Sequence, residues 1–342
     1  AYARTRANDG SLLKQTLGAP FGAKRVGEMM KSKILVYGAG AIGSIFAGKL
    51  AVCNNDITIL ARNERYEEIT KNGIILKNAL TQKTETIKVK CIKELKSNDA
   101  YDYILVVVQN NQIDQILPIL TKNISKNIVF VVNNPSGYSK FIEAVGKDRV
   151  MLGFPSAGGE RKDGVVTYFI GTGIAKIIQT TTFAELDGTT TERLLKLIEI
   201  FKKAKFDPTS SSNMDAWQKT HVAFVVPIAN ALLRFNSENK KLAKSRKTLN
   251  EMILATREGF NALKQSGIPV EPRKLNFYYM PRWLLITFYQ ILFMTKISEY
   301  SMAKHTIVAK EEIKHIEEQF LVQFSSCKFD YWKKLHLTTA ST

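Results

Sequence analysis

Three glycines with the spacing G-x-G-x-x-G constrain the fold of this chain more than any other feature. Gly38, Gly40 and Gly43 directly follow an apolar run at residues 33–37 and open a segment with helical periodicity. The first glycine permits a tight turn, the second lets a diphosphate approach the backbone, and the third lets helix and strand pack closely. Because a second apolar run follows at residues 57–60, we expect a dinucleotide site of the Rossmann type, rather than a glycine-rich turn without a ligand.

The end of the second apolar run should contact the adenosine ribose of such a dinucleotide. An NAD site places Asp or Glu there to accept a hydrogen bond from the 2′-hydroxyl group. This chain has Arg62 at that position, and a guanidinium can pair with a 2′-phosphate through two hydrogen bonds. We therefore expect NADP, bound as NADPH, rather than NAD. The alternative is that Arg62 is a surface residue and that Glu64 contacts the ribose.

Apolar and helical segments alternate through the first half of the chain. Residues 103–108 and 127–132 are almost wholly apolar, which is typical of strands covered on both faces, and residues 112–120 between them have the spacing of an amphipathic helix. This alternation predicts an α/β fold with a doubly wound parallel sheet. We expect residues 165–170 and 174–178 to complete the same sheet as antiparallel strands.

A polar segment with a proline, at residues 207–212, separates this half from one that is helical to about residue 324. The predicted second domain is therefore all-helical, and we expect the final residues to be frayed. The chain is predicted to have an N-terminal extension over residues 1–30, an NADP-binding Rossmann domain over 31–207, a helical substrate and catalytic domain over 208–330, and a tail over 331–342.

The chain is strongly basic, with a formal net charge of +18 from 49 Lys and Arg against 31 Asp and Glu. Such a charge can indicate nucleic acid or another anionic partner. The lysines are spread along the chain, however, so we expect a solvated lysine-rich surface and no nucleic-acid partner. Three scattered cysteines do not form a disulfide framework, and no Cys/His cluster has the spacing of a zinc site.

The longest strongly apolar run, residues 283–294, is too short to cross a hydrocarbon core of ~30 Å. We expect a buried helix there and no membrane partner, although residues 277–293 could instead bury a homodimer surface. Residues 1–28 lack the continuous apolar stretch of a secretory signal. They are rich in arginine and poor in acid, as a mitochondrial presequence is, but glycines and a proline break any long amphipathic helix. The expected location is cytoplasmic.

Five short segments occur in a distinctive order and spacing: Gly38–Gly43, Leu60–Asn63, Asn133–Gly137, Glu185–Gly188 and Trp217–Lys219. In this respect the chain resembles a divergent member of the ketopantoate reductase (2-dehydropantoate 2-reductase) family, from residue 31 to about residue 324. The resemblance implies a Rossmann domain, a helical domain, and an active site between them. There NADPH would reduce a small 2-keto acid, such as ketopantoate to pantoate.

The resemblance also implies three catalytic residues. Lys219, in a W-x-K context, would hydrogen-bond the substrate ketone and supply the proton as hydride arrives. Asn134 matches an asparagine on the nicotinamide side of the site; the alternative is a turn residue, since Asn before Pro often opens a turn. Glu312 matches a glutamate that contacts the substrate hydroxyl or the lysine, but it could equally be a solvated charge on a helix face.

The resemblance also implies residues that contact the cofactor and the substrate. Gln109 stands where many family members carry a lysine, in the turn after the third strand. Ser301 matches a serine that contacts the substrate carboxylate. Outside the family pattern, Arg161 could clamp a carboxylate and His305 could approach the cleft, unless it is a structural histidine. The predicted cofactor-binding residues are Gly38, Ala39, Gly40, Ala41, Ile42, Gly43, Arg62, Gln109 and Asn134.

Two departures from the family pattern bear on the substrate. The family's catalytic lysine is usually followed, one and two turns later, by asparagines that bind substrate, and here these positions hold Ala223 and Pro227. Loss of both amides should weaken recognition of the ketopantoate hydroxyl. His221 lies two residues after Lys219, so the two do not share a helix face, and we expect His221 to have a packing role. The alternative to a reductase is an NADP-binding regulatory or sensor protein without turnover.

Overall fold

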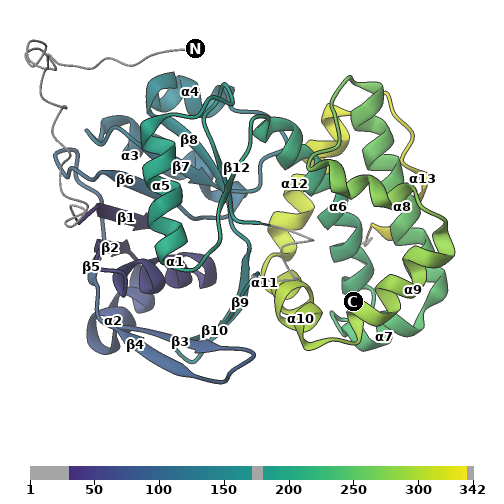
Figure 1. Ribbon diagram of the computed structural model, residues 1–342, viewed down its shortest axis with the longest axis horizontal. Helices are drawn as coiled ribbons and strands as arrows, with labels where there is room; N and C mark the ends of the chain where they lie inside the picture. The colour runs from purple at the N-terminus through teal and green to yellow at the C-terminus, as the bar shows by residue number, and fades with distance from the viewer. Residues whose placement is uncertain (1–30, 172–179, 337–342) are drawn as a thin grey trace, which may run out of the picture. The chain divides into compact units, whose positions relative to one another are not determined.

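The computed structural model describes residues 31–171 and 180–336, without the side chains of Ser301 and His305. Residues 32–342 form one compact unit. An eight-stranded sheet lies on one side of it and a group of helices on the other (Figure 1). This arrangement confirms the predicted α/β fold followed by an all-helical part.

The eight-stranded sheet has the order β12-β11-β8-β7-β6-β1-β2-β5. All neighbouring strands in it are parallel except β11 and β8, which are antiparallel. The chain passes from β1 to β2 in one direction and returns to β6 on the other side of β1, so the crevice expected to bind a ligand lies at the carboxyl ends of β1 and β6. The strands are β1 Lys33–Tyr37, β2 Asp56–Leu60, β5 Lys90–Ile92, β6 Tyr103–Val106, β7 Ile128–Val131, β8 Val150–Phe154, β11 Thr182–Ala184 and β12 Thr209–Ser210.

Helices cover both faces of this sheet, which explains why its strands are almost wholly apolar. Along β1, Ile34 and Val36 face the core that contains α1 and α5, whereas Leu35 and Tyr37 face the core that contains α3 and α4. Alternate residues of one strand thus serve two separate cores. The helices are α1 Ala41–Ala51, α2 Asn63–Asn72, α3 Ile113–Lys122, α4 Ser139–Val145 and α5 Glu192–Lys203.

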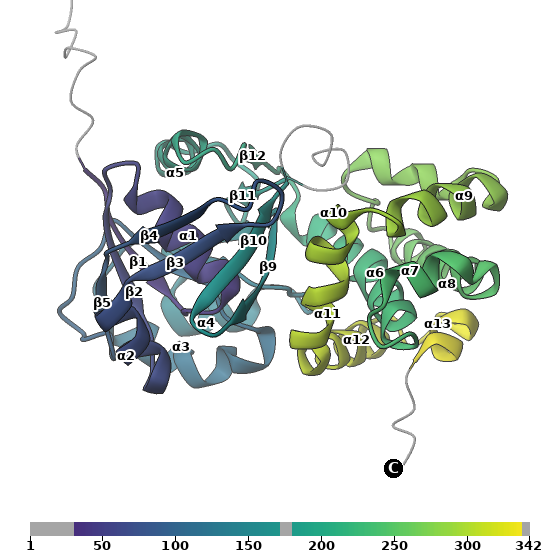
Figure 2. The ribbon, with the colours of Figure 1, turned by 90° about the horizontal axis from the view of Figure 1, so that it is seen from below.

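A second sheet of four strands has the order β4-β3-β10-β9 (Figure 2). Its strands are β3 Ile74–Asn78, β4 Thr84–Ile87, β9 Ala157–Lys162 and β10 Val165–Ile170. The expectation that residues 165–170 complete the main sheet was wrong: they form β10, which pairs with β9 and β3. The tight turn at Asp163 and Gly164, both with positive φ, folds β10 back on β9 as a hairpin. The other expected strand, at residues 174–178, lies outside the described residues.

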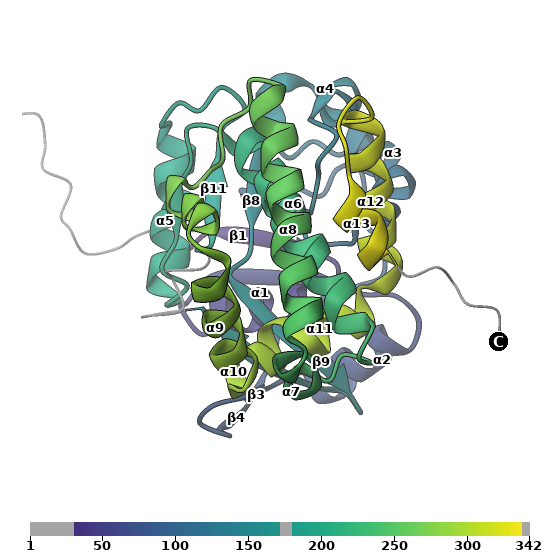
Figure 3. The same cartoon turned by 90° about the vertical axis from the view of Figure 1, so that its right-hand side faces the viewer.

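The C-terminal part is helical, and within the described residues it contains no strand after Ser210. The central helix α6 packs beside α8 (Figure 3). The predicted junction at 207/208 falls just before β12, which still belongs to the sheet. The helices are α6 Met214–Leu233, α7 Asn239–Lys244, α8 Arg246–Gln265, α9 Arg282–Phe293, α10 Lys296–Ser298, α11 Lys304–Val308, α12 Lys310–Gln323 and α13 Asp330–Leu335, with a π-helical turn at Glu299–Ala303.

Two expectations about the helical part need correction. The apolar run at residues 283–294 forms α9, but only one side of that helix is buried, and Trp283 is 62% exposed. Residues 330–335, within the segment expected to be frayed, form α13, in which Trp332 is buried and its Nε1 donates to the Glu317 carboxylate; residues 337–342 lie outside the described residues. Among the described residues, no helix combines the length and apolar character that a membrane span requires.

Candidate active site

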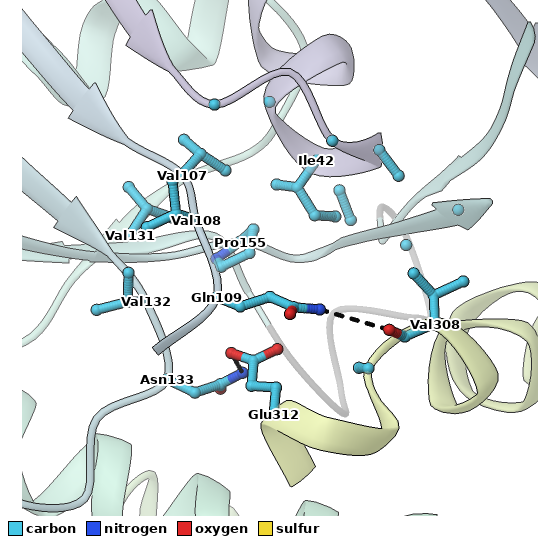
Figure 4. A pocket seen from close by; sticks show the side chains of 18 of the residues that line it. Ile42, Val107, Val108, Gln109, Val131, Val132, Asn133, Pro155, Val308 and Glu312 are labelled. Atoms are coloured by element: carbon cyan, nitrogen blue, oxygen red, sulfur yellow. Dashed lines mark hydrogen bonds between the residues drawn. The ribbon is translucent and has the colours of Figure 1, made fainter. Parts of the chain in front are cut away.

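A cavity of about 640 Å³ lies where the carboxyl ends of β1, β6 and β7 meet helices α6 and α12. Its walls come from the glycine turn, from the segments after β6, β7 and β8, and from α12 (Figure 4). Helix α6 completes the lining. The cavity is therefore at the point where the direction of strand order changes, as expected for a ligand site in such a sheet.

The glycine turn is shaped to admit a ligand at its middle position. A Cβ on Gly38, which has φ of +119°, would lie 2.2 Å from the carbonyl oxygen of Val107, and one on Gly43 would lie 1.9 Å from the carbonyl oxygen of Gly38. A Cβ on Gly40 would meet nothing within 4 Å. Gly38 and Gly43 are thus required by the fold, whereas Gly40 borders open space in the cavity.

The start of α1 offers uncapped backbone N–H groups beside this space. Gly40 is the N-cap residue and provides no side-chain cap, and the first turn of α1 carries no acidic residue. The N-terminus of a helix binds anions through these N–H groups and through the helix dipole. All six residues from Gly38 to Gly43 line the cavity. The turn therefore fits the diphosphate of a dinucleotide.

Three arginines, Arg62, Arg65 and Arg161, line the cavity near the glycine turn. Arg62 lies at the start of α2 and its Nη2 donates to the Tyr37 hydroxyl at 3.1 Å. Glu64, the alternative contact for the ribose, is exposed and is not among the residues that line the cavity. The end of β2 thus presents a cation, and not a carboxylate, to the cavity.

Arg65 is a residue that the sequence analysis missed. It is 8% exposed, and its guanidinium donates to the Ser44 hydroxyl at 2.9 Å and to the Ala39 carbonyl at 3.3 Å. Burial lowers the pKa of Arg65, while hydrogen bonding to Glu68 opposes the shift. Its spacing of three residues from Arg62, in the first turn of α2, is the signal that could have found it.

Arg161, the predicted carboxylate clamp, lines the cavity, and its role toward a substrate stays a prediction. Its Nη1 is 3.1 Å from Oε2 of Glu68, the same carboxylate oxygen that accepts from Arg65 at 2.9 Å. Arg161 therefore belongs to the arginine group beside the glycine turn. This position is closer to phosphate binding than to recognition of a keto acid.

Glu312 and Asn133 form the polar contact between the sheet and α12 (Figure 4). Glu312 is 6% exposed, and its Oε1 accepts from Nδ2 of Asn133 at 3.2 Å and from the backbone N–H of Asn110 at 3.4 Å. Gln109 reaches the same helical side, with Nε2 3.4 Å from the Val308 carbonyl oxygen. The side chains of Glu312, Gln109 and Asn133 all line the cavity, so Glu312 is not a solvated surface charge.

The amide of Asn133 has one further property. Its Oδ1 is buried and has no hydrogen-bond partner among the described residues. A buried acceptor without a donor is costly, so a hydroxyl or amide donor from a bound ligand would stabilise this position. The glycine turn thus fits the diphosphate of a nicotinamide dinucleotide, and the free acceptor of Asn133 fits a donor group of the same ligand.

Asn134, the predicted catalytic asparagine, is a turn residue in this structure. Its Nδ2 donates to the Gly137 carbonyl oxygen at 2.6 Å, and its Oδ1 accepts from the backbone N–H of Ser136 at 3.2 Å. Asn134 is not among the residues that line the cavity, whereas its neighbour Asn133 is. The turn alternative describes Asn134, and the cavity amide is one residue earlier.

Lys219 also differs from its expected position. Its Nζ lies 2.5 Å from Oδ2 of Asp215, one turn earlier on α6, and the residue is 7% exposed. The α6 residues that line the cavity are His221, Phe224, Val225, Ile228 and Ala229, without Lys219. In this conformation Lys219 is thus paired with Asp215 and does not line the cavity, and its role as proton donor stays a prediction.

Packing between α6 and α8 explains this orientation of α6. Lys219, Ala223 and Pro227 are four residues apart and so form one stripe of the helix. Ala223 packs against α8 so closely that a Cβ on Gly259 would lie 2.8 Å from the Cβ of Ala223. Because Ala223 faces α8, the opposite side of α6, which carries His221, faces the cavity.

His221 lies in an aromatic environment at the cavity wall. Its ring is 4.2 Å from that of Phe154 and stacks on that of Trp217 at 5.5 Å between centroids. These contacts agree with the expected packing role, while the position of His221 at the cavity was not expected. The other two predicted substrate residues, Ser301 and His305, have side chains outside the described part of the structure.

This fold and this cavity define a protein of the Rossmann class whose cavity fits a dinucleotide. Residues 34–180 match the family model described as "Ketopantoate reductase PanE/ApbA". Over these residues the chain is similar to the ketopantoate reductase family.

Known proteins show the same relationship at low sequence identity. The 2-dehydropantoate 2-reductase of Pyrococcus horikoshii is 25% identical over 238 residues, which cover 69% of this chain and 75% of that protein. The crystal structure of 2-dehydropantoate 2-reductase from Geobacter metallireducens superposes with a TM-score of 0.70 at 15% identity, over 88% of this chain and 97% of that one. The structure of D-mandelate dehydrogenase solved with NADH and anilino(oxo)acetate superposes with a TM-score of 0.68 at 16% identity. The superposition covers 89% of this chain and 95% of that one. The two structures establish the shared fold.

Proposed function

We propose that the chain catalyses NADPH-dependent reduction of a small 2-keto acid. The observation that carries this proposal is that one cavity extends from the phosphate-binding turn, Gly38–Gly43, to α6 and α12. A dinucleotide whose diphosphate binds at this turn would direct its nicotinamide toward the helical wall. When bound, NADPH supplies a hydride to the ketone carbon. Similarity to the ketopantoate reductase family over residues 34–180 supports the keto acid as the acceptor.

The choice of NADPH over NADH rests on the arginines beside the glycine turn. Arg62 follows β2, where an NAD site would carry a carboxylate. Arg65 and Arg161 add two more cations to the same part of the cavity wall. A 2′-phosphate would find charge-assisted hydrogen-bond donors there, which are stronger than donors to a neutral hydroxyl.

The proposed proton donor is Lys219, because of its W-x-K context. In that role its ammonium must leave Asp215 and turn toward the ketone oxygen. The side chain of Asp215 is 39% exposed, so water can solvate its carboxylate once the ammonium of Lys219 turns away. His221 is the competing donor, since it already lies at the cavity wall on the same helix.

Glu312 would then hold the helical wall against the sheet. Its contacts to Asn133 and to the backbone of Asn110 keep α12 beside the ends of β6 and β7. This arrangement limits the access of water to the reacting carbon and positions the amide of Asn133 beside the nicotinamide. The role of Glu312 is thus one of positioning and of contact with the substrate.

A second function, NADPH binding without turnover, is favoured by one observation. Lys219 is paired with Asp215 and is not among the residues that line the cavity. A protein that senses the cofactor needs the glycine turn and the arginines but no proton donor.

Purified protein mixed with NADPH and a panel of 2-keto acids, ketopantoate included, separates these functions. A reductase consumes the absorbance of reduced nicotinamide with at least one acid. A sensor binds NADPH, measured by calorimetry, and oxidises it with none. Absence of NADPH binding would refute both.

A further inference from the structure

We infer that the substrate is a 2-keto acid with a bulky apolar side chain, branched aliphatic or aromatic, rather than one with a hydroxyl group. This inference rests on the proposed function and concerns the wall of the same cavity. It follows from the side chains that α6 and its neighbours present there.

The α6 wall is apolar except at His221. Phe224, Val225, Ile228 and Ala229 line the cavity along two turns of the helix. Because these positions face the cavity in the folded chain, a substrate held against α6 meets ring and methyl groups. The aliphatic and aromatic part of such a substrate is stabilised by removal of its surface from water.

Polar side chains elsewhere on α6 are occupied by other parts of the protein. Nε2 of Gln218 donates to the Val132 carbonyl oxygen at 3.1 Å, and Nδ2 of Asn230 donates to Oε1 of Glu317 at 3.1 Å. Both amides therefore hold the fold together. They do not replace the two substrate-binding asparagines that the resemblance leads one to expect on this helix.

Side chains of neighbouring segments extend the apolar lining beside α6. Phe154 and Pro155 come from the end of β8, and Ile297 and Met302 come from the segment around α10. Thr306 also lines the cavity, but its hydroxyl donates to the Met302 carbonyl oxygen at 2.7 Å. A substrate hydroxyl that lies against the apolar side chains of these described residues would lose its hydrogen bonds to water without replacement.

The expected discrimination follows from the character of this wall. A hydrophobic pocket distinguishes substrates that differ by one methylene by about 10- to 200-fold in kcat/KM. We therefore expect kcat/KM for 4-methyl-2-oxopentanoate or phenylpyruvate to exceed that for ketopantoate by at least about tenfold, with NADPH as the reductant.

Val225 offers the sharpest test because it lines the cavity and is only half-buried. The V225N variant places an amide on the wall and should lower kcat/KM for the apolar acids by about tenfold or more, while kcat/KM for ketopantoate rises or stays constant. The matched control is V322N, because Val322 is 76% exposed on α12. The control should leave unchanged the ratio of kcat/KM for the apolar acids to kcat/KM for ketopantoate. Affinity for NADPH should be the same in all three proteins.

Product binding gives a readout that needs no turnover. Calorimetry on the protein with oxidised cofactor should show tighter binding of phenyllactate than of pantoate, and V225N should reduce that difference. A kcat/KM ratio below about tenfold in favour of the apolar acids, or a ratio that V225N leaves unchanged, overturns the inference while the reductase function stands. If no acid is reduced, the proposed function fails. Tighter binding of pantoate than of phenyllactate would then overturn the inference as well.

Discussion

Oε1 of Glu312 accepts a hydrogen bond from Nδ2 of Asn133 at 3.2 Å, across a sequence separation of 179 residues. The same oxygen accepts from the backbone N–H of Asn110 at 3.4 Å. One buried carboxylate on α12 thus joins the ends of β6 and β7 and closes the helical side of the cavity. The helical part is held at the nucleotide crevice through these contacts.

The E312A substitution tests this junction. It leaves the donors of Asn133 and Asn110 without their acceptor, so we expect the free energy of unfolding to fall by about 1–3 kcal/mol. Urea denaturation measures this change. E311A is the matched control, because Glu311 is the preceding residue of α12 and is exposed. Equal stability of the two variants would show that the junction does not stabilise the fold.

The two candidate proton donors, Lys219 and His221, are distinguished by the kinetics of their alanine variants. If Lys219 is the donor, K219A lowers kcat by about 100-fold or more, and H221A mainly raises KM. Steady-state kinetics with NADPH and the best keto acid measure both. The converse pattern, a large loss of kcat in H221A with kcat retained in K219A, would assign the proton to His221. NADPH affinity should be unchanged in both variants.

The proposed preference for the phosphorylated cofactor is tested at Arg62. The R62A substitution removes charge-assisted hydrogen bonds worth about 1.5–3 kcal/mol, so we expect the Kd for NADPH to rise by about tenfold or more. The Kd for NADH should change little, because its ribose carries no phosphate. Calorimetric titration of both cofactors into both proteins measures the effect. Equal weakening for NADH and NADPH would show that Arg62 does not read the 2′-phosphate.

The sequence predicts the nucleotide crevice well, because the signals there are local. The run at residues 33–37 forms β1 without a change of boundary, and the glycine spacing opens α1 at Ala41. Turn geometry, close approach and helix start are all determined by neighbours in the chain. Arg62 reaches the cavity for the same reason, since it directly follows β2.

The helical half could not be predicted to the same depth, because rotation of a helix about its axis depends on distant partners. The W-x-K segment predicts that Lys219 lies on α6, but the contact between Ala223 and Gly259 on α8 determines which side of α6 faces the cavity. The pairing of β10 with β3 depends in the same way on residues far along the chain. Trp332 is buried through its partner Glu317, which local polarity near the chain end does not reveal.

The most direct test of the account is the affinity for NADPH of a Gly40→Val variant. A side chain at this position meets no atom of the protein within 4 Å of its Cβ, so the thermal midpoint should stay within a few degrees of the unsubstituted protein. The same side chain fills the space that a diphosphate needs. The account predicts loss of NADPH binding by calorimetry, by about 100-fold or more, in a protein that is still folded. A folded variant that binds NADPH as tightly as the original chain would contradict it.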